Sequence, residues 1–206
     1  MLTFSEDPHA YHWNGKKIPG VTDIIGQWQE ISVYGIKYFA SVFDGLVLSE
    51  ETFRQARDFG NAVHKIALFS LNDNEIDMES LHPSLHEPLV QLNKWRDEWK
   101  PVILEVERPM YSAKYGYAGK PDIVCLIRKR LCVVDIKTGM YGMAGPQIAA
   151  YEQLYREYRK TWARIDRYVL HLPKDDGAYR FVQMKRQNDL DFFLSRYYQY
   201  KFLRAA

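Results

Sequence analysis

Two aspartates and a lysine stand out in this chain because they border or interrupt apolar segments. Asp122 follows Gly119-Lys120-Pro121, and thirteen positions after it comes the run Asp135-Ile136-Lys137. In a β-strand alternate side chains share a face, so Asp135 and Lys137 should point one way and Ile136 the other. Carboxylates beside an ammonium group suit Mg²⁺ chemistry. This hard cation binds carboxylate, water and phosphate oxygens, while the lysine can position a reacting water or phosphate.

The segments around these residues predict how they meet. Residues 123–127 and 131–134 are apolar and predict two buried strands, joined by the polar turn Arg128-Lys129-Arg130. Such a hairpin brings Asp122 alongside Asp135 at one edge of a sheet. A buried carboxylate without a partner costs several kcal/mol, which favours a bound cation over the alternative of an exposed edge-strand pair.

The rest of the pattern predicts the elements that would hold this core. Asn14-Gly15 predicts the type I′ turn of a hairpin over residues 11–18. Thr22 predicts the N-cap of a helix that continues through Trp28. Apolar spacing then predicts mostly helix over 36–70, a helix that starts near Pro83 and Pro88 and carries Leu89 to Trp99, strands over 102–111, 117–127 and 131–137, a helix over 145–160, strands over 164–172 and 178–184, and a helix over 187–203.

Several further residues could belong to the site. A single histidine on an apolar helix, such as His64, is usually a hydrogen-bonded core residue, and its place ahead of the acidic core is what favours metal ligation. Gln147 and Tyr151 lie four residues apart on one helical face, where many such pairs simply contact each other. The other histidines lack comparable context and are expected to be structural or surface groups: His9, His12, His82, His86 and His171.

Taken in order, these residues resemble the PD-(D/E)XK nuclease superfamily and, within it, the RecB-type exonuclease branch. Asp122 together with Asp135-Ile136-Lys137 resembles the D-x(n)-D-x-K core. Gly60-Asn61-Ala62-Val63-His64 resembles the helical G-x-x-x-H motif, which supplies a metal-ligating histidine. Gln147-Ile148-Ala149-Ala150-Tyr151 resembles the Q-x-x-x-Y motif of the helix after the active-site strand.

The resemblance also assigns roles. Glu107 resembles the acidic residue of the first core strand, although Glu105 lies on the same face and is an alternative. Lys137 would orient the attacking water or offset charge in the transition state, and Gln147 and Tyr151 would hold DNA or water near the metal. The implied catalytic residues are Lys137, Asp122, Asp135, Glu107, Gln147 and Tyr151, and the implied ligands of one or two Mg²⁺ or Mn²⁺ ions are His64, Asp122, Asp135 and the main-chain carbonyl of Ile136.

The resemblance implies a fold and a function. The fold would be α/β and restriction-endonuclease-like, with a mixed central sheet flanked by helices and a helical N-terminal region. The function would be that of a metal-dependent DNA exonuclease in recombination, repair or phage DNA processing. Its partners would be DNA and a recombination or annealing protein. Two alternatives stay open: a structure-specific endonuclease, and a catalytically weak nucleic-acid-binding module of the same fold.

Length and composition set the limits of this interpretation. The 206 residues and 24.3 kDa, 47% of them hydrophobic, suffice for one domain with one core. We expect a mostly helical part over 1–100 and a catalytic core with a final helix over 101–206. A net charge of +2 does not by itself require a nucleic-acid partner. Residues 156–167, however, carry five basic and two acidic side chains, which indicates either a solvated helix face or a basic patch.

Cysteine content and hydropathy exclude other classes. Some RecB-type nucleases carry an iron–sulfur cluster held by four cysteines, but this chain has only Cys125 and Cys132, so no such cluster is expected. Neither a charged-then-apolar leader nor a run of eighteen apolar residues is present. We therefore expect a soluble, cytoplasmic protein that has no membrane partner.

Overall fold

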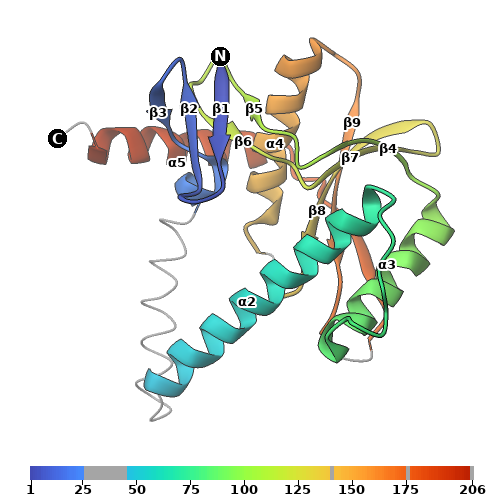
Figure 1. The fold of residues 1–206 in the computed structure, drawn as a ribbon. Coiled ribbons are helices and arrows are strands. Elements are labelled where there is room, and N and C mark those ends of the chain that lie inside the picture. The colour runs from blue at the N-terminus through green and yellow to red at the C-terminus, as the bar shows by residue number, and fades with distance from the viewer. Residues whose placement is uncertain (26–45, 140–141, 175–176, 205–206) are drawn as a thin grey trace.

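The computed structural model describes residues 1–25, 46–139, 142–174 and 177–204, and its centre is a five-stranded sheet (Figure 1). The strand order is β10-β9-β8-β7-β4. The strands span Val102–Val106 (β4), Ile123–Ile127 (β7), Arg130–Lys137 (β8), Ile165–His171 (β9) and Arg180–Gln183 (β10). Helices cover both faces of this sheet. The predicted α/β class, with a mixed central sheet flanked by helices, is therefore confirmed.

The central strands β7, β8 and β9 combine both kinds of pairing. The predicted hairpin of β7 and β8 is antiparallel, and its turn is shorter than expected. Arg128 and Lys129 have φ angles of 50° and 65°, the left-handed conformation that a two-residue type I′ turn needs, and Arg130 already belongs to β8. Strand β9 is parallel to β8, so the chain must cross over between them, and helix α4 (Ala144–Arg159) makes this connection.

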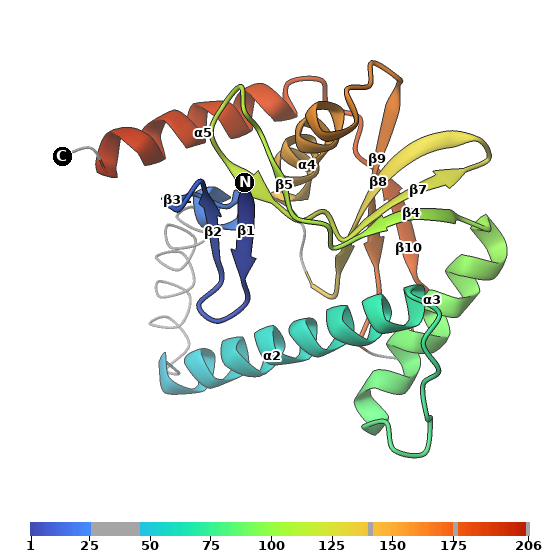
Figure 2. The same ribbon diagram turned by 45° about the horizontal axis from the view of Figure 1, so that its top comes forward.

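Two helical layers enclose the sheet (Figures 1 and 2). One layer holds α2 (Leu46–Leu71), the 3₁₀ helix η1 (Pro83–Leu85) and α3 (His86–Trp99), and the other holds α4 and α5 (Asp189–Arg204). Strand alternation divides the core between the layers. Val133 packs with α4 and α5, whereas its neighbours Cys132 and Val134 pack with α2 and α3.

The N-terminal residues form a small antiparallel sheet, which lies between α2 and α5 in Figure 2. Its strands are β1 (Leu2–Ser5), β2 (Ala10–Trp13) and β3 (Lys16–Ile18). The predicted hairpin is confirmed, with φ angles of 50° at Asn14 and 78° at Gly15 in its turn. Strand β1 was not predicted, because its four residues carry no turn signal or alternation that separates them from a loop.

A helix begins directly after this sheet, at residue 21. The Asp23 carboxylate accepts a hydrogen bond of 2.9 Å from the Gly20 N–H, in the manner of the third helical residue of a capping box. Thr22 lies within the first turn, so its prediction as N-cap was wrong. The predicted continuation through Trp28 lies outside the described residues.

The strands predicted over 102–111 and 117–127 are each divided in two. Strand β4 ends before Glu107, whose φ of 44° turns the chain out of the extended conformation. Pro121, which has no N–H to donate to a neighbouring strand, divides the second predicted strand, and the part after it is β7. The detached pieces, β5 (Met110–Tyr111) and β6 (Ala118–Gly119), pair with each other.

The other predicted elements agree with the observed ones to within two residues at each end where the structure describes them. The predicted helical region over 36–70 corresponds to α2, and its part over 36–45 lies outside the described residues. Of the helices that the structure describes, none combines the length and the apolar character needed to cross a membrane.

The N-terminus of α4 is in close contact with the start of α5. The Asp189 carboxylate lies so near Gly145 that a Cβ atom added there would be 2.8 Å from Oδ2. Asp189 is buried in the first turn of α5, and its carboxylate also lies 3.2 Å from Arg167 on β9. One carboxylate therefore connects two helices and a strand, and it lies near the positive end of the α4 dipole.

Gly119 allows β6 to pack closely on α4, which yields a test of this packing. A Cβ atom at residue 119 would lie 2.8 Å from Tyr151 and 3.0 Å from Val21, so the neighbouring structure would have to move. We predict that Gly119→Ala lowers the free energy of unfolding in urea by about 1–3 kcal/mol. Gly139→Ala is the control, because a Cβ atom there meets nothing within 4 Å. Equal stability of the two variants would contradict the packing.

Candidate functional site

A cavity of about 210 Å³ opens where the end of β8 meets α2, α4 and the N-terminal sheet. Seven of the eight residues predicted for the site line it with their side chains: His64 from α2, Glu107 after β4, Asp122 before β7, Asp135 and Lys137 from β8, and Gln147 and Tyr151 from α4. The eighth, Ile136, takes part only through its main chain, because its side chain packs in the opposite layer with α2 and α3.

Asp135 and Lys137 form an ion pair on the side of β8 that faces α4. The Lys137 Nζ atom lies 2.6 Å from Asp135 Oδ2, and the Asp135 side chain is 1% exposed. Apart from this ion pair, Oδ2 has no hydrogen-bond partner in the described part of the chain. Burial lowers the pKa of Lys137, but the carboxylates of Asp135 and Asp122 raise it by more, so the pKa lies above its usual value. Lys137 is therefore positively charged at neutral pH.

Asp122 faces Asp135 across the hairpin. Ile123 pairs with Val134, so the next position places Asp122 opposite Asp135. The Asp122 Oδ2 atom accepts a 2.7 Å hydrogen bond from the Ile136 N–H. Burial raises the pKa of Asp122 to about 6, with His64 opposing and Asp135 adding to this effect. The site thus contains a carboxylate that is costly to keep charged without a cation.

His64 connects α2 to the same strand end. Its Nε2 atom is 2.7 Å from the Ile136 carbonyl oxygen, which can only accept, so Nε2 carries the proton. In the neutral ring, Nδ1 then presents a lone pair, and it lies 3.7 Å from Asp122 Oδ2. Two electron-rich atoms therefore face each other beside a main-chain carbonyl, and this place favours a cation.

The structure distinguishes the two glutamates near the end of β4. Glu107 has a positive φ and lines the cavity, where its Oε1 atom lies 3.3 Å from Lys120 Nζ. Glu105 does not line this cavity, and its Oε2 atom lies 3.8 Å from Arg108 Nε. The geometry therefore favours Glu107 as the acidic residue of the site.

Gln147 and Tyr151 contact each other across one turn of α4, as their spacing predicts. The Gln147 Nε2 atom donates a 3.2 Å hydrogen bond to the Tyr151 hydroxyl oxygen. Burial and the negative charges of Asp135 and Asp122 raise the pKa of Tyr151 well above its usual value. Tyr151 therefore stays neutral, and its hydroxyl keeps a proton to donate within the cavity.

Sequence reasoning missed several side chains of the cavity wall, among them Lys120, Tyr11 and His9. Lys120 lies against the Phe4 ring and pairs with Glu107, and its place in the run before Asp122 was the available signal. Tyr11 is buried, and burial raises its pKa. His9 lies at the exposed rim. Tyr11 and His9 reach the cavity only because β2 and the loop before it pack near the end of β8, and no local pattern in the sequence indicates this.

The donor set can be compared with what a divalent cation requires. Among the described residues, no group of three or more His, Cys, Asp or Glu side chains is arranged to hold a metal ion. The carboxylates of Asp135 and Glu107 are instead turned toward lysines. The chemistry nevertheless fits a hard cation, because carboxylate and carbonyl oxygens and one imidazole nitrogen meet at the same strand end. A metal ion would compete with Lys137 for the buried Asp135 oxygen.

The raised pKa of Asp122 makes a prediction about stability in EDTA. A carboxyl group whose pKa is raised by folding stabilises the fold fully only below its unfolded pKa near 3.9, and this stability is lost as the pH rises through about 6. Asp122→Asn removes the charge and keeps an acceptor for the Ile136 N–H. We predict that it raises the free energy of unfolding in urea by about 3 kcal/mol at pH 8, and by less than about 1 kcal/mol at pH 4.

The matched control is Asp97→Asn on the exposed side of α3, which should change stability by less than about 0.5 kcal/mol at either pH. A gain for Asp122→Asn that is the same at both pH values would mean that packing rather than charge limits stability there.

Comparison with known proteins adds little to this geometry. No protein-family model matches the chain, and no curated protein sequence matches it. Among solved structures, the crystal structure of SSO0001 is similar over 69% of this chain and 85% of that chain, with 12% sequence identity and a TM-score of 0.33. A likeness of this size says nothing about what the chain does, so a functional proposal has to rest on the site itself.

Proposed function

We propose that this protein is a metal-dependent deoxyribonuclease that hydrolyses phosphodiester bonds, acting as an exonuclease in recombination, repair or phage DNA processing. The observation that supports the proposal is the convergence of its predicted residues. Side chains from five separate segments, between residues 64 and 151, line one cavity of about 210 Å³. The order of these residues in the sequence resembles the RecB-type pattern, and this resemblance is independent of their distances in the structure.

The proposed cofactor is one or two Mg²⁺ or Mn²⁺ ions. His64, Asp122, Asp135 and the Ile136 carbonyl would hold an ion, with Glu107 as a further oxygen donor. A bound ion would polarise the scissile phosphate and lower the pKa of a coordinated water. The raised pKa of Asp122 fits this role, because a cation beside the carboxylate relieves the cost of its buried charge.

The remaining residues act on the substrate in this proposal. The charged ammonium group of Lys137 is held in place by Asp135. Lys137 can therefore orient a water molecule or offset charge that develops on the phosphate. The neutral Tyr151 hydroxyl, fixed by Gln147, can donate a hydrogen bond to a phosphate oxygen. Lys120 can attract the DNA backbone at the cavity wall. The protein would act in the cytoplasm, on DNA and beside a recombination or annealing protein.

Asp135→Asn tests the proposed activity. We expect the wild-type protein to degrade linear DNA in Mg²⁺ or Mn²⁺, and we expect the variant to lose more than about a hundredfold in rate while keeping its circular-dichroism spectrum. Linear, circular and single-stranded DNA should be compared side by side. Cleavage of circles would indicate the endonuclease alternative, and retention of DNA without cleavage would indicate a binding module. A variant that cuts at the wild-type rate would show that the site is misassigned.

Lys137→Gln separates chemistry from metal binding. An ammonium group cannot be a metal ligand, and the substitution frees the Asp135 oxygen that Lys137 now contacts. We expect a loss in cleavage of more than about a hundredfold, with Mn²⁺ affinity in calorimetric titration equal to or above that of the wild type. His64→Gln is the matched variant, and it should lower Mn²⁺ affinity by about tenfold or more. Equal losses of Mn²⁺ affinity in both variants would mean that Lys137 positions the metal ligands instead of acting on the phosphate.

A further inference from the structure

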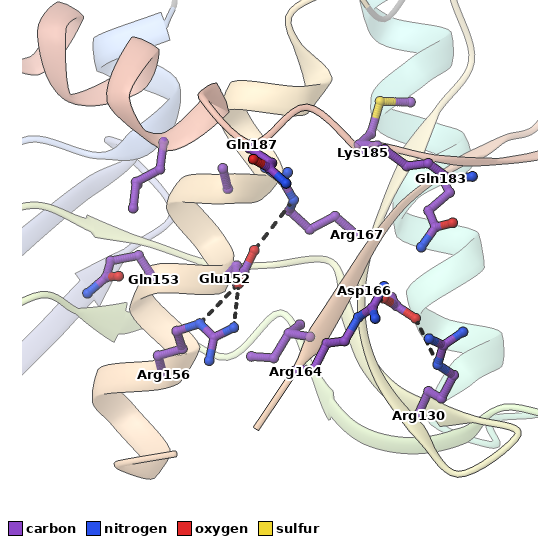
Figure 3. Close-up of a pocket in the computed structure, with 14 residues that line it drawn as sticks. Arg130, Glu152, Gln153, Arg156, Arg164, Asp166, Arg167, Gln183, Lys185 and Gln187 are labelled. Carbon is purple, nitrogen blue, oxygen red and sulfur yellow. Dashed lines mark hydrogen bonds and ion pairs between the residues drawn. The ribbon is translucent and has the colours of Figure 1, made fainter. Parts of the chain in front are cut away.

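A second and larger cleft lies on the other side of α4. Its volume is about 750 Å³, and it is enclosed by α4, the start of β9 and residues 183–190 (Figure 3). Glu152 and Arg156 of α4 line it, and they are rotated by roughly 140° around the helix from Gln147 and Tyr151, which line the candidate site. A ligand in the cleft would therefore not touch the groups proposed for catalysis.

The cleft is strongly basic. Its lining contains five basic and two acidic side chains, an excess of three positive charges, and one more carboxylate, Asp189, contacts Arg167 from outside the lining. Even after Asp189 is counted, the excess of two equals the net charge of the whole chain. The basic members are Arg130, Arg156, Arg164, Arg167 and Lys185, and the acidic members are Glu152 and Asp166. Three of the five basic residues in the sequence pattern over 156–167, Arg156, Arg164 and Arg167, thus line a concave surface.

The inner arginines of the cleft are fully engaged within the protein. Arg156 bonds to Glu152 through two nitrogens and to the Ala163 carbonyl through a third. Arg167 lies 3.4 Å from Glu152 (Figure 3). It also donates a hydrogen bond to the Arg186 carbonyl. These contacts use the guanidinium donors to build the floor of the cleft, so the inner pair has a structural role.

The outer arginines are arranged differently. The Asp166 side chain is 4% exposed and lies between Arg130 and Arg164, 3.2 Å and 3.3 Å from their Nε atoms. The two arginine side chains are 57% and 78% exposed. Within the described residues, no protein group accepts a hydrogen bond from their terminal Nη atoms. The buried carboxylate thus holds both guanidinium groups in ion pairs through their Nε atoms, and both side chains stay more than half exposed, so each keeps donors that can bind phosphate.

An exposed aromatic ring lies in a hollow next to the cleft. Trp162, in the loop between α4 and β9, is 96% exposed and lines an adjoining hollow of about 430 Å³ together with Lys114 and Lys160. Arg156 lines both the hollow and the cleft, so the two adjoin each other. A solvent-exposed indole beside cationic groups is the combination on which unpaired bases stack.

We propose that this cleft is a second nucleic-acid-binding site, which takes a single strand. Arg130, Arg164 and Lys185 would bind backbone phosphates, and Trp162 would stack on an unpaired base. The choice of DNA as the polyanion rests on the proposed nuclease function, but the site does not depend on cleavage. The cleft would hold a strand that the candidate site, about seven residues and roughly 23 Å away along β8, is not cutting.

The test is binding of a fluorescein-labelled oligo(dT) strand, measured by anisotropy in EDTA over a range of salt concentrations. We expect Arg164→Gln/Lys185→Gln to weaken binding and to make the slope of log K against log salt shallower by about 1.4, because each phosphate contact on a single strand contributes about 0.7. Asp166 keeps Arg130 as a partner in this variant, so the fold is retained. Trp162→Ala should weaken binding by about fivefold or more and abolish quenching of tryptophan fluorescence.

The control is Lys94→Gln/Lys201→Gln, which removes the same charge from exposed positions on α3 and α5 and should leave the salt slope unchanged. The proposal is overturned if the cleft variant and Trp162→Ala bind like the wild type, or if polyglutamate competes as well as DNA, which would indicate an acidic protein as the partner. Because EDTA removes any metal, these outcomes are independent of the cleavage assay. Binding through the cleft without cleavage would refute only the proposed function.

Discussion

The arrangement of the site depends on burying negative charge at the end of a central strand. Asp135 is almost fully enclosed, and Asp122 lies opposite it in a hairpin that is otherwise apolar. Each carboxylate must therefore be compensated by a nearby cation or hydrogen-bond donor. Lys137 pairs with Asp135, and the Ile136 N–H donates a hydrogen bond to Asp122, whereas the His64 Nδ1 atom beside Asp122 presents a lone pair. The end of β8 thus supplies both compensating groups, and α2 brings one more electron-rich atom to the same place.

The two cavities use similar groups with opposite net charge. Three acidic side chains and two lysines line the candidate site, an excess of one negative charge, whereas the cleft beyond α4 is positive. In both places a buried carboxylate fixes a cationic side chain, Lys137 in one and the outer arginines in the other. The net charge differs in sign between them. The negative candidate site suits a metal cation, and the positive cleft suits phosphates.

Local patterns predicted the elements well and the site only in part. The hairpin of β7 and β8 and the helix α4 follow from alternation, turn chemistry and helical spacing, and these also placed Asp135, Lys137, Gln147 and Tyr151 on shared faces. The direction of the Glu107 side chain depends on the positive φ angle of this residue, and nothing in the local sequence indicates such an angle. The contributions of Tyr11 and Lys120, and the shape of the basic cleft, result from packing between distant segments, which periodicity does not encode.

The contact between Asp189 and Gly145 has a consequence for the architecture of the chain. This carboxylate occupies the first turn of α5 and at the same time the space beside the start of α4. Gln147 follows two residues after Gly145, so the last helix of the chain supports the helix that carries part of the cavity wall. The described residues of α5 contribute no side chain to that cavity, but α5 supports the helix α4, which does. The last helix therefore helps to hold the cavity wall in position.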